Sequence, residues 1–133
     1  MTNDFFNEAF MTVNKTLNYL KSEQSIVVLP FGDAVVISDK HLKGAGGLAG
    51  EGYPMPYHGC ILAIDVYDGT SVHSDTGEIK FSAGDRISVY AVYDVASFTV
   101  YAQKNGINTA VFVSSVAGNT DLFATVTVKV TES

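Results

Sequence analysis

The side chains that could carry out chemistry are few and scattered along this chain. The three histidines, His41, His58 and His73, lack the H-x-H or H-x-x-x-H spacing that places two metal ligands on one strand or helix face. No serine has the flanking glycines of a nucleophile elbow. Cys60 lies in the apolar run "GCILAIDV", which predicts a small buried side chain without a disulfide partner. We therefore expect no catalytic residues, no enzyme activity, no metal and no cofactor.

Acidic residues gather in one short segment, residues 65–78, with the sequence "DVYDGTSVHSDTGE". Its carboxylates, Asp65, Asp68, Asp75 and Glu78, are the oxygen ligands that Ca²⁺ prefers. The segment lacks the alternating acids and the final glutamate of a calcium-binding loop. The pattern favours a solvated hairpin end, and cation binding stays open as the alternative.

Glycines are concentrated between residues 39 and 59, in "DKHLKGAGGLAGEGYPMPYHG". Gly44, Gly46 and Ala49 follow the order G-x-G-x-x-A of dinucleotide-binding turns. That motif needs a strand directly before it and a helix directly after it, and the flanking residues favour neither. The sequence therefore predicts a long loop without nucleotide binding, and loops of this length are often functional.

Three rings stand close together at the end of this loop, in "EGYPMPYHG". Two prolines stiffen the backbone around Tyr53, Tyr57 and His58, so the rings would be presented at a low cost in entropy. Such rings can stack on a sugar, pack against a protein receptor or cover an edge of their own domain. We take these three residues as the candidate ligand or receptor contacts.

Short strands and glycine-rich turns dominate the chain after residue 24. Strands are predicted at residues 25–29, 34–38, 60–67, 78–81, 85–93, 96–103, 108–114 and 122–130. They are separated by "PFGD", "DGT", "SAG", "KNG" and "AGNTD". In the last strand, apolar residues alternate with Thr125, Thr127 and Lys129, so one face is buried. We expect a mainly β head at residues 25–133, a β-sandwich or jelly roll of about eight strands.

One α-helix is predicted in front of this head, within residues 1–24. Its apolar stripe steps by four, three, four and three residues, which fits the 3.5-residue seam of a helix bundle. The stripe consists of Phe6, Phe10, Val13, Leu17 and Leu20. We expect these residues to form an oligomer interface, and aromatic residues in so short a seam favour more than two helices. Packing of the helix on its own head remains the alternative.

Charge and hydropathy exclude several classes of partner. Fourteen acidic against eight basic residues give a net charge of −6, and the basic residues form no run, so nucleic-acid binding is not expected. No apolar run approaches the roughly 20 residues of a membrane span. No basic segment followed by an apolar one marks a signal peptide at the N-terminus. These features predict a soluble protein made in the cytoplasm.

Three segments resemble the knobs of bacteriophage fibre and head-decoration proteins: "MPYHGCILAIDVYDG" (55–69), "FSAGDRISVYA" (81–91) and "TDLFATVTVKV" (120–130). They are more distantly similar to the trimeric jelly rolls of tumour-necrosis-factor and complement-type domains. The resemblance implies a structural virion protein, assembled in the host cytoplasm as a homotrimer and attached to other virion proteins. It also implies adhesion to a host-surface glycan, and leaves capsid decoration, head fibre and tail fibre open. The alternative is a carbohydrate- or receptor-binding β-sandwich module that uses the aromatic residues of the 39–59 loop.

Overall fold

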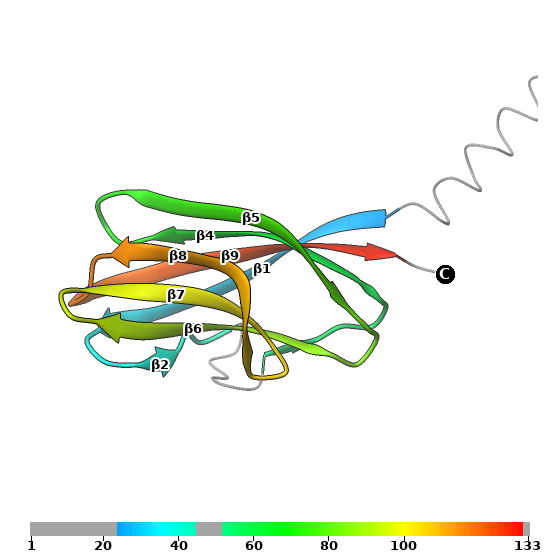
Figure 1. The fold of residues 1–133 in the computed structure, drawn as a ribbon, viewed down its shortest axis with the longest axis horizontal. Coiled ribbons are helices and arrows are strands. Elements are labelled where there is room, and N and C mark those ends of the chain that lie inside the picture. Colours follow the sequence, from blue (N-terminus) through cyan, green and yellow to red (C-terminus); the bar gives the residue numbers. More distant parts are fainter. Residues whose placement is uncertain (1–23, 45–51, 132–133) are drawn as a thin grey trace, which may run out of the picture.

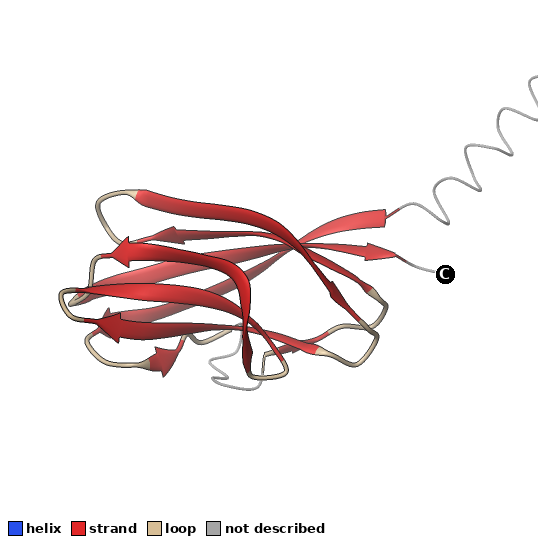
Figure 2. Cartoon of the chain, in the orientation of Figure 1, coloured by secondary structure: helices blue, strands red, loops and turns tan. Residues whose placement is uncertain are grey.

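The computed structural model describes residues 24–44 and 52–131, and all regular structure in them is β-strand (Figures 1 and 2). The strands are β1 (Gln24–Val36), β2 (Lys40–His41), β3 (Tyr53–Pro54), β4 (Gly59–Tyr67), β5 (Val72–Phe81), β6 (Arg86–Asp94), β7 (Ser97–Lys104), β8 (Ile107–Val116) and β9 (Thr120–Thr131). This confirms the prediction of a mainly β protein. The predicted helix and its stripe lie outside the described residues, except for Gln24, which begins β1. No helix capable of crossing a membrane occurs among the described residues.

Two antiparallel sheets pack face to face. One has the strand order β1-β9-β4-β5, and the other has the order β2-β6-β7-β8. β3 also pairs with β6. The short strands β2 and β3 therefore lie along the same side of β6, β2 at Tyr90–Ala91 and β3 at Arg86–Ile87. Hairpins join β4 to β5, β6 to β7 and β7 to β8 within their sheets. The sandwich is thus established, whereas the jelly-roll connectivity is not confirmed.

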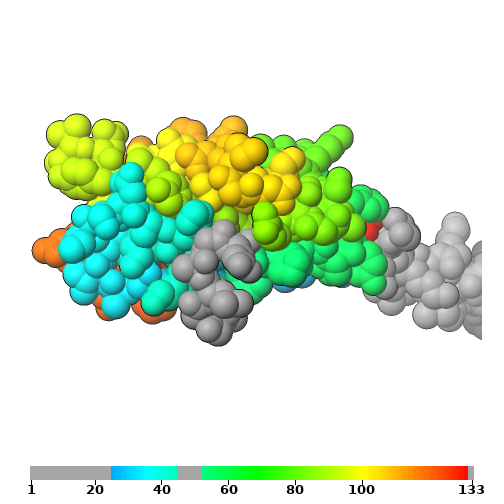
Figure 3. All heavy atoms as spheres, turned by 90° about the horizontal axis from the view of Figure 1, so that it is seen from below, coloured from blue at the N-terminus to red at the C-terminus, as the bar shows by residue number. Residues whose placement is uncertain are grey.

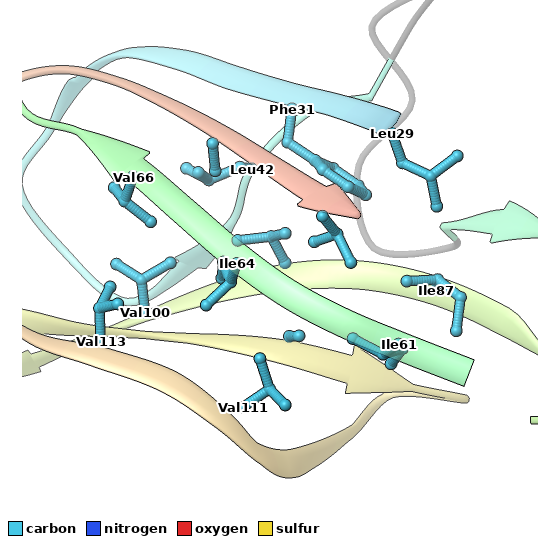
Figure 4. Close-up of a cluster of buried hydrophobic side chains, with 14 of the residues drawn as sticks. Leu29, Phe31, Leu42, Ile61, Ile64, Val66, Ile87, Val100, Val111 and Val113 are labelled. Atoms are coloured by element: carbon cyan, nitrogen blue, oxygen red, sulfur yellow. The ribbon is translucent and has the colours of Figure 1, made fainter. Parts of the chain in front are cut away.

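The core lies between the sheets and is built by alternate residues of each strand (Figure 4). Ile61, Ile64 and Val66 of β4 face Ile87 of β6 and Val100 of β7 across the core. All five of these side chains are closed to solvent. Burying one such aliphatic side chain contributes about 1.5–3 kcal/mol. Cys60 is 7% exposed, which confirms its prediction as a buried residue.

The N-terminal part of the first sheet differs from expectation. Two strands, 25–29 and 34–38, were predicted on either side of a turn at "PFGD", but β1 runs without interruption from Gln24 to Val36. Proline is compatible with an edge strand because its missing N–H can face away from the neighbouring strand. β1 is such an edge, with β9 its one partner along the four-stranded sheet. The irregularity lies later, between Asp33 and Val36, where Val35 has a φ of 43°.

The remaining strand predictions are close to the structure, with one exception. Five of the predicted strands, from 60–67 to 122–130, match β4, β6, β7, β8 and β9 to within two residues at each end. The exception is β5, which was predicted at 78–81 and begins at Val72. Its first half is polar and mostly exposed, so apolar alternation could not reveal it. With β2 and β3, the described residues hold nine strands where about eight were expected.

Candidate functional site: an apolar groove beside the free edge of β1

An apolar groove opens at the end of the sandwich where β1 begins. Its volume is about 350 Å³. One side consists of the first residues of β1 and the last residues of β9, and the other side consists of the segment 53–57. The groove is lined by Ser25, Val27, Leu29, Tyr53, Pro54, Met55, Pro56, Tyr57, Val128 and Val130. Seven of these ten residues are aliphatic, methionine or proline, so the groove suits apolar side chains.

Tyr53 forms a fixed wall of this groove. Its hydroxyl donates a hydrogen bond to the Pro30 carbonyl oxygen at 2.8 Å. Its ring packs edge-on against Phe31, with 5.2 Å between the ring centroids and an angle of 77° between the planes. On the other side, a Cβ at Gly44 would approach the Tyr53 ring to 3.1–3.2 Å. Tyr53 therefore covers the edge of its own domain, which was one of the three roles expected for it.

Tyr57 and His58, the other two predicted contact residues, are placed differently. Tyr57 lines the groove and is 40% exposed, so its ring is available to a partner. His58 is exposed and does not line the groove, although its carbonyl oxygen accepts a hydrogen bond from Thr131 at 2.9 Å. That bond ties the 53–58 segment to the end of β9. The structure thus brings Tyr53 and Tyr57 together and leaves His58 outside.

Along the edge of β1 beside the groove, some backbone groups have no partner strand among the described residues. Gly32 exchanges hydrogen bonds of 2.8 and 3.0 Å with Lys43, on the side of β1 that faces away from β9. Backbone groups alternate sides along a strand, so those of Pro30, Val28 and Ile26 face the same way. Pro30 has no N–H, and its carbonyl accepts the Tyr53 hydroxyl. Among the described residues, no strand pairs with β1 at Val28 or Ile26 on this side.

Among the described residues, Pro30 is the one protective feature of this edge, and no charge or covering strand shields Ile26 and Val28. Ile26 and Val28 are 59% and 54% exposed. No charged residue occurs from Ser25 to Gly32. Proteins usually protect sheet edges with charges, bulges or a covering segment, because an open edge pairs with other chains. Sequence reasoning missed this edge because it divided β1 at Pro30 and did not place it at the border of a sheet.

The acidic segment 65–78 is a hairpin, as predicted, but its central carboxylate is buried. Asp68 is 4% exposed. Its Oδ1 accepts hydrogen bonds from the backbone nitrogens of Thr70 and Ser71 at 3.0 and 2.9 Å. Its Oδ2 accepts hydrogen bonds from the Ala117 nitrogen at 3.0 Å and from His73 Nε2 at 2.9 Å. The described residues hold no group of three or more side chains that could share a metal ion.

Hydrogen bonding determines the charge of Asp68. The bonds from the backbone of Ser71 and of Ala117, and then that from His73, hold the pKa of this carboxyl well below its usual value of 3.8. Burial acts in the opposite direction and is outweighed. Asp68 is therefore ionised at neutral pH, with all four bonds directed to its own hairpin and to the β8–β9 connection. This arrangement gives it a structural role.

Comparison with other proteins adds no relatives. No family model, curated protein or solved structure matches this chain. The likeness to phage knobs accordingly rests on the three sequence segments that suggested it.

The geometry of the groove and the β1 edge is of the kind that binds polypeptide in other proteins. An added strand would find backbone partners at Ile26 and Val28, and its alternate side chains would face the groove. An amphipathic helix could instead lay its apolar stripe along the groove. The polar side chains in the lining are Ser25, Tyr53 and Tyr57, and none of them has a neighbouring base in the groove. The lining thus suits apolar packing.

Proposed function

We propose that this chain is a non-enzymatic structural protein of a bacteriophage virion, a homotrimer whose β heads are held together at the end where β1 begins. The observation that carries the proposal is the coincidence, at this end, of the apolar groove and the β1 edge at Ile26 and Val28, with which no described strand pairs. In the proposal, a helix within residues 1–23 packs its stripe against the same stripe of two other copies. The jelly-roll prediction is not needed for it.

Apolar exposure at this end supports assembly. Ile26, Val28 and Tyr57 are each at least 40% exposed beside an apolar groove. Burying apolar area yields about 25 cal/mol per Å², so association that covers these side chains is favourable. Association also removes the risk that the open edge pairs indiscriminately. The assembled heads would project from the helices and attach to other virion proteins on a capsid or a tail.

The opposite end of the head supports a role in adhesion. There, the β6–β7 turn presents Val95 and Tyr93, which are 86% and 52% exposed. Val95 has a φ of 59°, a left-handed conformation that is unfavourable for a β-branched residue. Tyr93 is tied to the β1–β2 connection by a bond of 2.6 Å from its nitrogen to Asp39. In the proposal this end faces the host surface.

A second candidate function is a carbohydrate- or receptor-binding module that uses the aromatic residues of the 39–59 loop. The exposure of Tyr57 in the groove favours it. Since the lining is mainly apolar, the groove suits an apolar segment of a protein receptor better than a sugar. The loss of receptor binding in Tyr57→Ala, with stability unchanged, would support this function over assembly.

The assembly proposal is tested by placing charges in the helix stripe. Phe10→Asp combined with Leu17→Asp should convert the trimer into monomers, as measured by light scattering after size exclusion. Thr12→Asp with Tyr19→Asp has the same spacing and charge change but lies off the stripe, so this control should remain trimeric. An unchanged mass of the stripe variant, or equal dissociation of both variants, would contradict the proposal.

A further inference from the structure

The outer face of the five-stranded sheet carries a row of rings that crosses four strands. In the register of the sheet, His41 of β2 is opposite Tyr90 of β6, Tyr90 is opposite Tyr101 of β7, and Tyr101 is opposite Phe112 of β8. The centroids of His41 and Tyr90 are 4.6 Å apart, and those of Tyr101 and Phe112 are 5.2 Å apart. All four side chains are at least partly exposed. The face therefore holds an accessible aromatic row.

A polar row lies beside the rings. It begins two residues before Tyr90 in β6 and two residues after Tyr101 in β7. Ser88 is opposite Gln103, and Gln103 is opposite Asn108 of β8. Gln103 Oε1 accepts hydrogen bonds from Ser88 Oγ at 3.2 Å and from His41 Nε2 at 2.8 Å. Gln103 Nε2 donates to Asn108 Oδ1 at 2.8 Å. Gln103 is 4% exposed, so these bonds hold it rigidly in a polar floor.

A shallow hollow of about 650 Å³ lies over this floor, within the ~300–1,000 Å³ range of ligand sites. It is lined by His41, Tyr90, Gln103, Gly106, Ile107 and Asn108. The chain segments that contribute to it, around residues 40, 90 and 105, meet on the face seen in Figure 3, where cyan, yellow-green and yellow atoms adjoin. The hollow is thus assembled from three separate parts of the sequence.

The wall of the hollow is held in place by the β7–β8 turn. Asn105 and Gly106 both have positive φ, 53° and 78°, as a type I′ hairpin turn requires. The Asn105 side chain accepts a hydrogen bond from the Arg86 nitrogen at 2.9 Å and donates one to Asp85 at 3.0 Å. This anchored turn presents Ile107, which is 71% exposed, at the rim of the hollow. A rigid wall lowers the entropic cost of binding a ligand.

The lining matches an uncharged, polyhydroxylated ligand. Among the described residues, no carboxylate, lysine or arginine lines the hollow. Among the described residues, neither the Tyr90 hydroxyl nor the Asn108 amide nitrogen has a hydrogen-bond partner. Both groups can therefore bind a ligand. Rings and an aliphatic side chain fit the C–H faces of a sugar, and amides fit its hydroxyls. The net charge of −6 disfavours acidic ligands.

We propose that this hollow, on the outer face of β6, β7 and β8, binds a neutral sugar. Tyr90 and Ile107 contact the C–H face of the ring, and Asn108 donates a hydrogen bond to a hydroxyl. The site is separate from the Tyr53–Tyr57 groove and does not depend on assembly of the chain. It extends the proposed function by giving the side of the head, near the β7–β8 turn, a glycan surface in addition to the β6–β7 end.

The test uses the full chain labelled with ¹⁵N and titrated with glucose, galactose, mannose, N-acetylglucosamine and N-acetylgalactosamine, each alone. N-acetylneuraminic acid serves as the charged probe. We expect at least one neutral sugar to shift the side-chain amide signals of Gln103 and Asn108 saturably, and the charged sugar to leave them unmoved. Neutral sugars that all fail to shift these signals, or an acidic sugar that binds more tightly, would overturn the proposal.

Variants locate the site. Asn108→Ala removes an exposed side chain and should weaken sugar binding about tenfold, the size expected for one neutral hydrogen bond. Ile107→Ala should weaken binding in the same direction without loss of folding, since Ile107 is exposed. Tyr57→Ala, in the groove, is the matched control and should bind like the wild type. A loss confined to Tyr57→Ala would place the sugar in the groove and refute the proposed hollow. Sugar binding is measured without reference to the mass of the protein. The sugar proposal and the assembly proposal can therefore fail independently of each other.

Discussion

The Asp68 carboxylate accepts a hydrogen bond from the backbone nitrogen of Ala117, 49 residues later in the chain, at 3.0 Å. This bond joins the β4–β5 turn to the β8–β9 connection, and the two loops lie at the same end of the sandwich (Figure 1). The same carboxylate closes its own turn through Thr70 and Ser71. One buried charge therefore fixes the end of the head that lies away from residue 24.

Asp68→Asn should destabilise the head by about 1.5–3 kcal/mol, the range for a hydrogen bond to a charged group. An amide can replace one oxygen, but its NH₂ would face the donors of Ala117 and His73. Urea unfolding at neutral pH measures the change. Asp94→Asn is the matched control, because Asp94 is exposed and its carboxylate has no partner among the described residues. Equal stabilities of the two variants would refute the role of Asp68.

Stability should fall in acid, and Asp68 should account for part of the fall. Its pKa in the folded protein lies well below the 3.8 of the unfolded chain, so its contribution is complete above that pH. As the pH falls below 3.8, the unfolded state takes up the proton first and the contribution is lost progressively. The difference in unfolding free energy between wild type and Asp68→Asn should therefore shrink from about pH 4.5 downward. A difference that stays constant with pH would contradict this.

The two tyrosines of the groove should respond differently to loss of the hydroxyl. Tyr53→Phe removes the bond to Pro30 and should destabilise the protein by about 1 kcal/mol. Tyr57→Phe alters an exposed residue and should change stability by less than about 0.5 kcal/mol. Thermal unfolding of both variants checks the contrast. If Tyr57→Phe is the more destabilising, the placement of these residues is wrong.

Hydrogen exchange should reveal the free edge of β1. In the monomer produced by the Phe10→Asp and Leu17→Asp substitutions, the amides of Ile26 and Val28 should exchange rapidly. The amides of Val27 and Leu29 face β9. Their exchange rates should be lower than those of Ile26 and Val28 by a factor of about ten or more. Uniform protection of all four amides would show that another segment covers the edge.

Local patterns in the sequence were sufficient for most of the second half of the fold. β6, β7 and β9 alternate apolar with more polar residues, and glycine turns precede β6, β8 and β9, so these local patterns indicate the limits of the strands. β1 was divided because proline is normally taken to stop a strand. Whether Pro30 interrupts a sheet depends on which side of the strand has a neighbour, and that is a property of the tertiary structure.

The binding surfaces were harder to predict. "EGYPMPYHG" marked Tyr53 and Tyr57 because their rings are close in sequence, and the two do share a groove. The hollow with His41, Tyr90 and Asn108 was missed because these residues are far apart in sequence. The register of β2, β6, β7 and β8 brings them together. Alternation along β6 places Tyr90 on the face opposite the buried Ile87 and Val89, and this was the available signal.

The central claim is that copies of this chain assemble through the end where β1 begins, and the mass of the wild-type protein in solution tests it most directly. Light scattering after size exclusion should give three times the 14.2 kDa mass of one chain. The mass should be unchanged on dilution across the range used for the other measurements. A mass of 14.2 kDa throughout that range would contradict the claim and leave the segment 1–24 to pack on its own head.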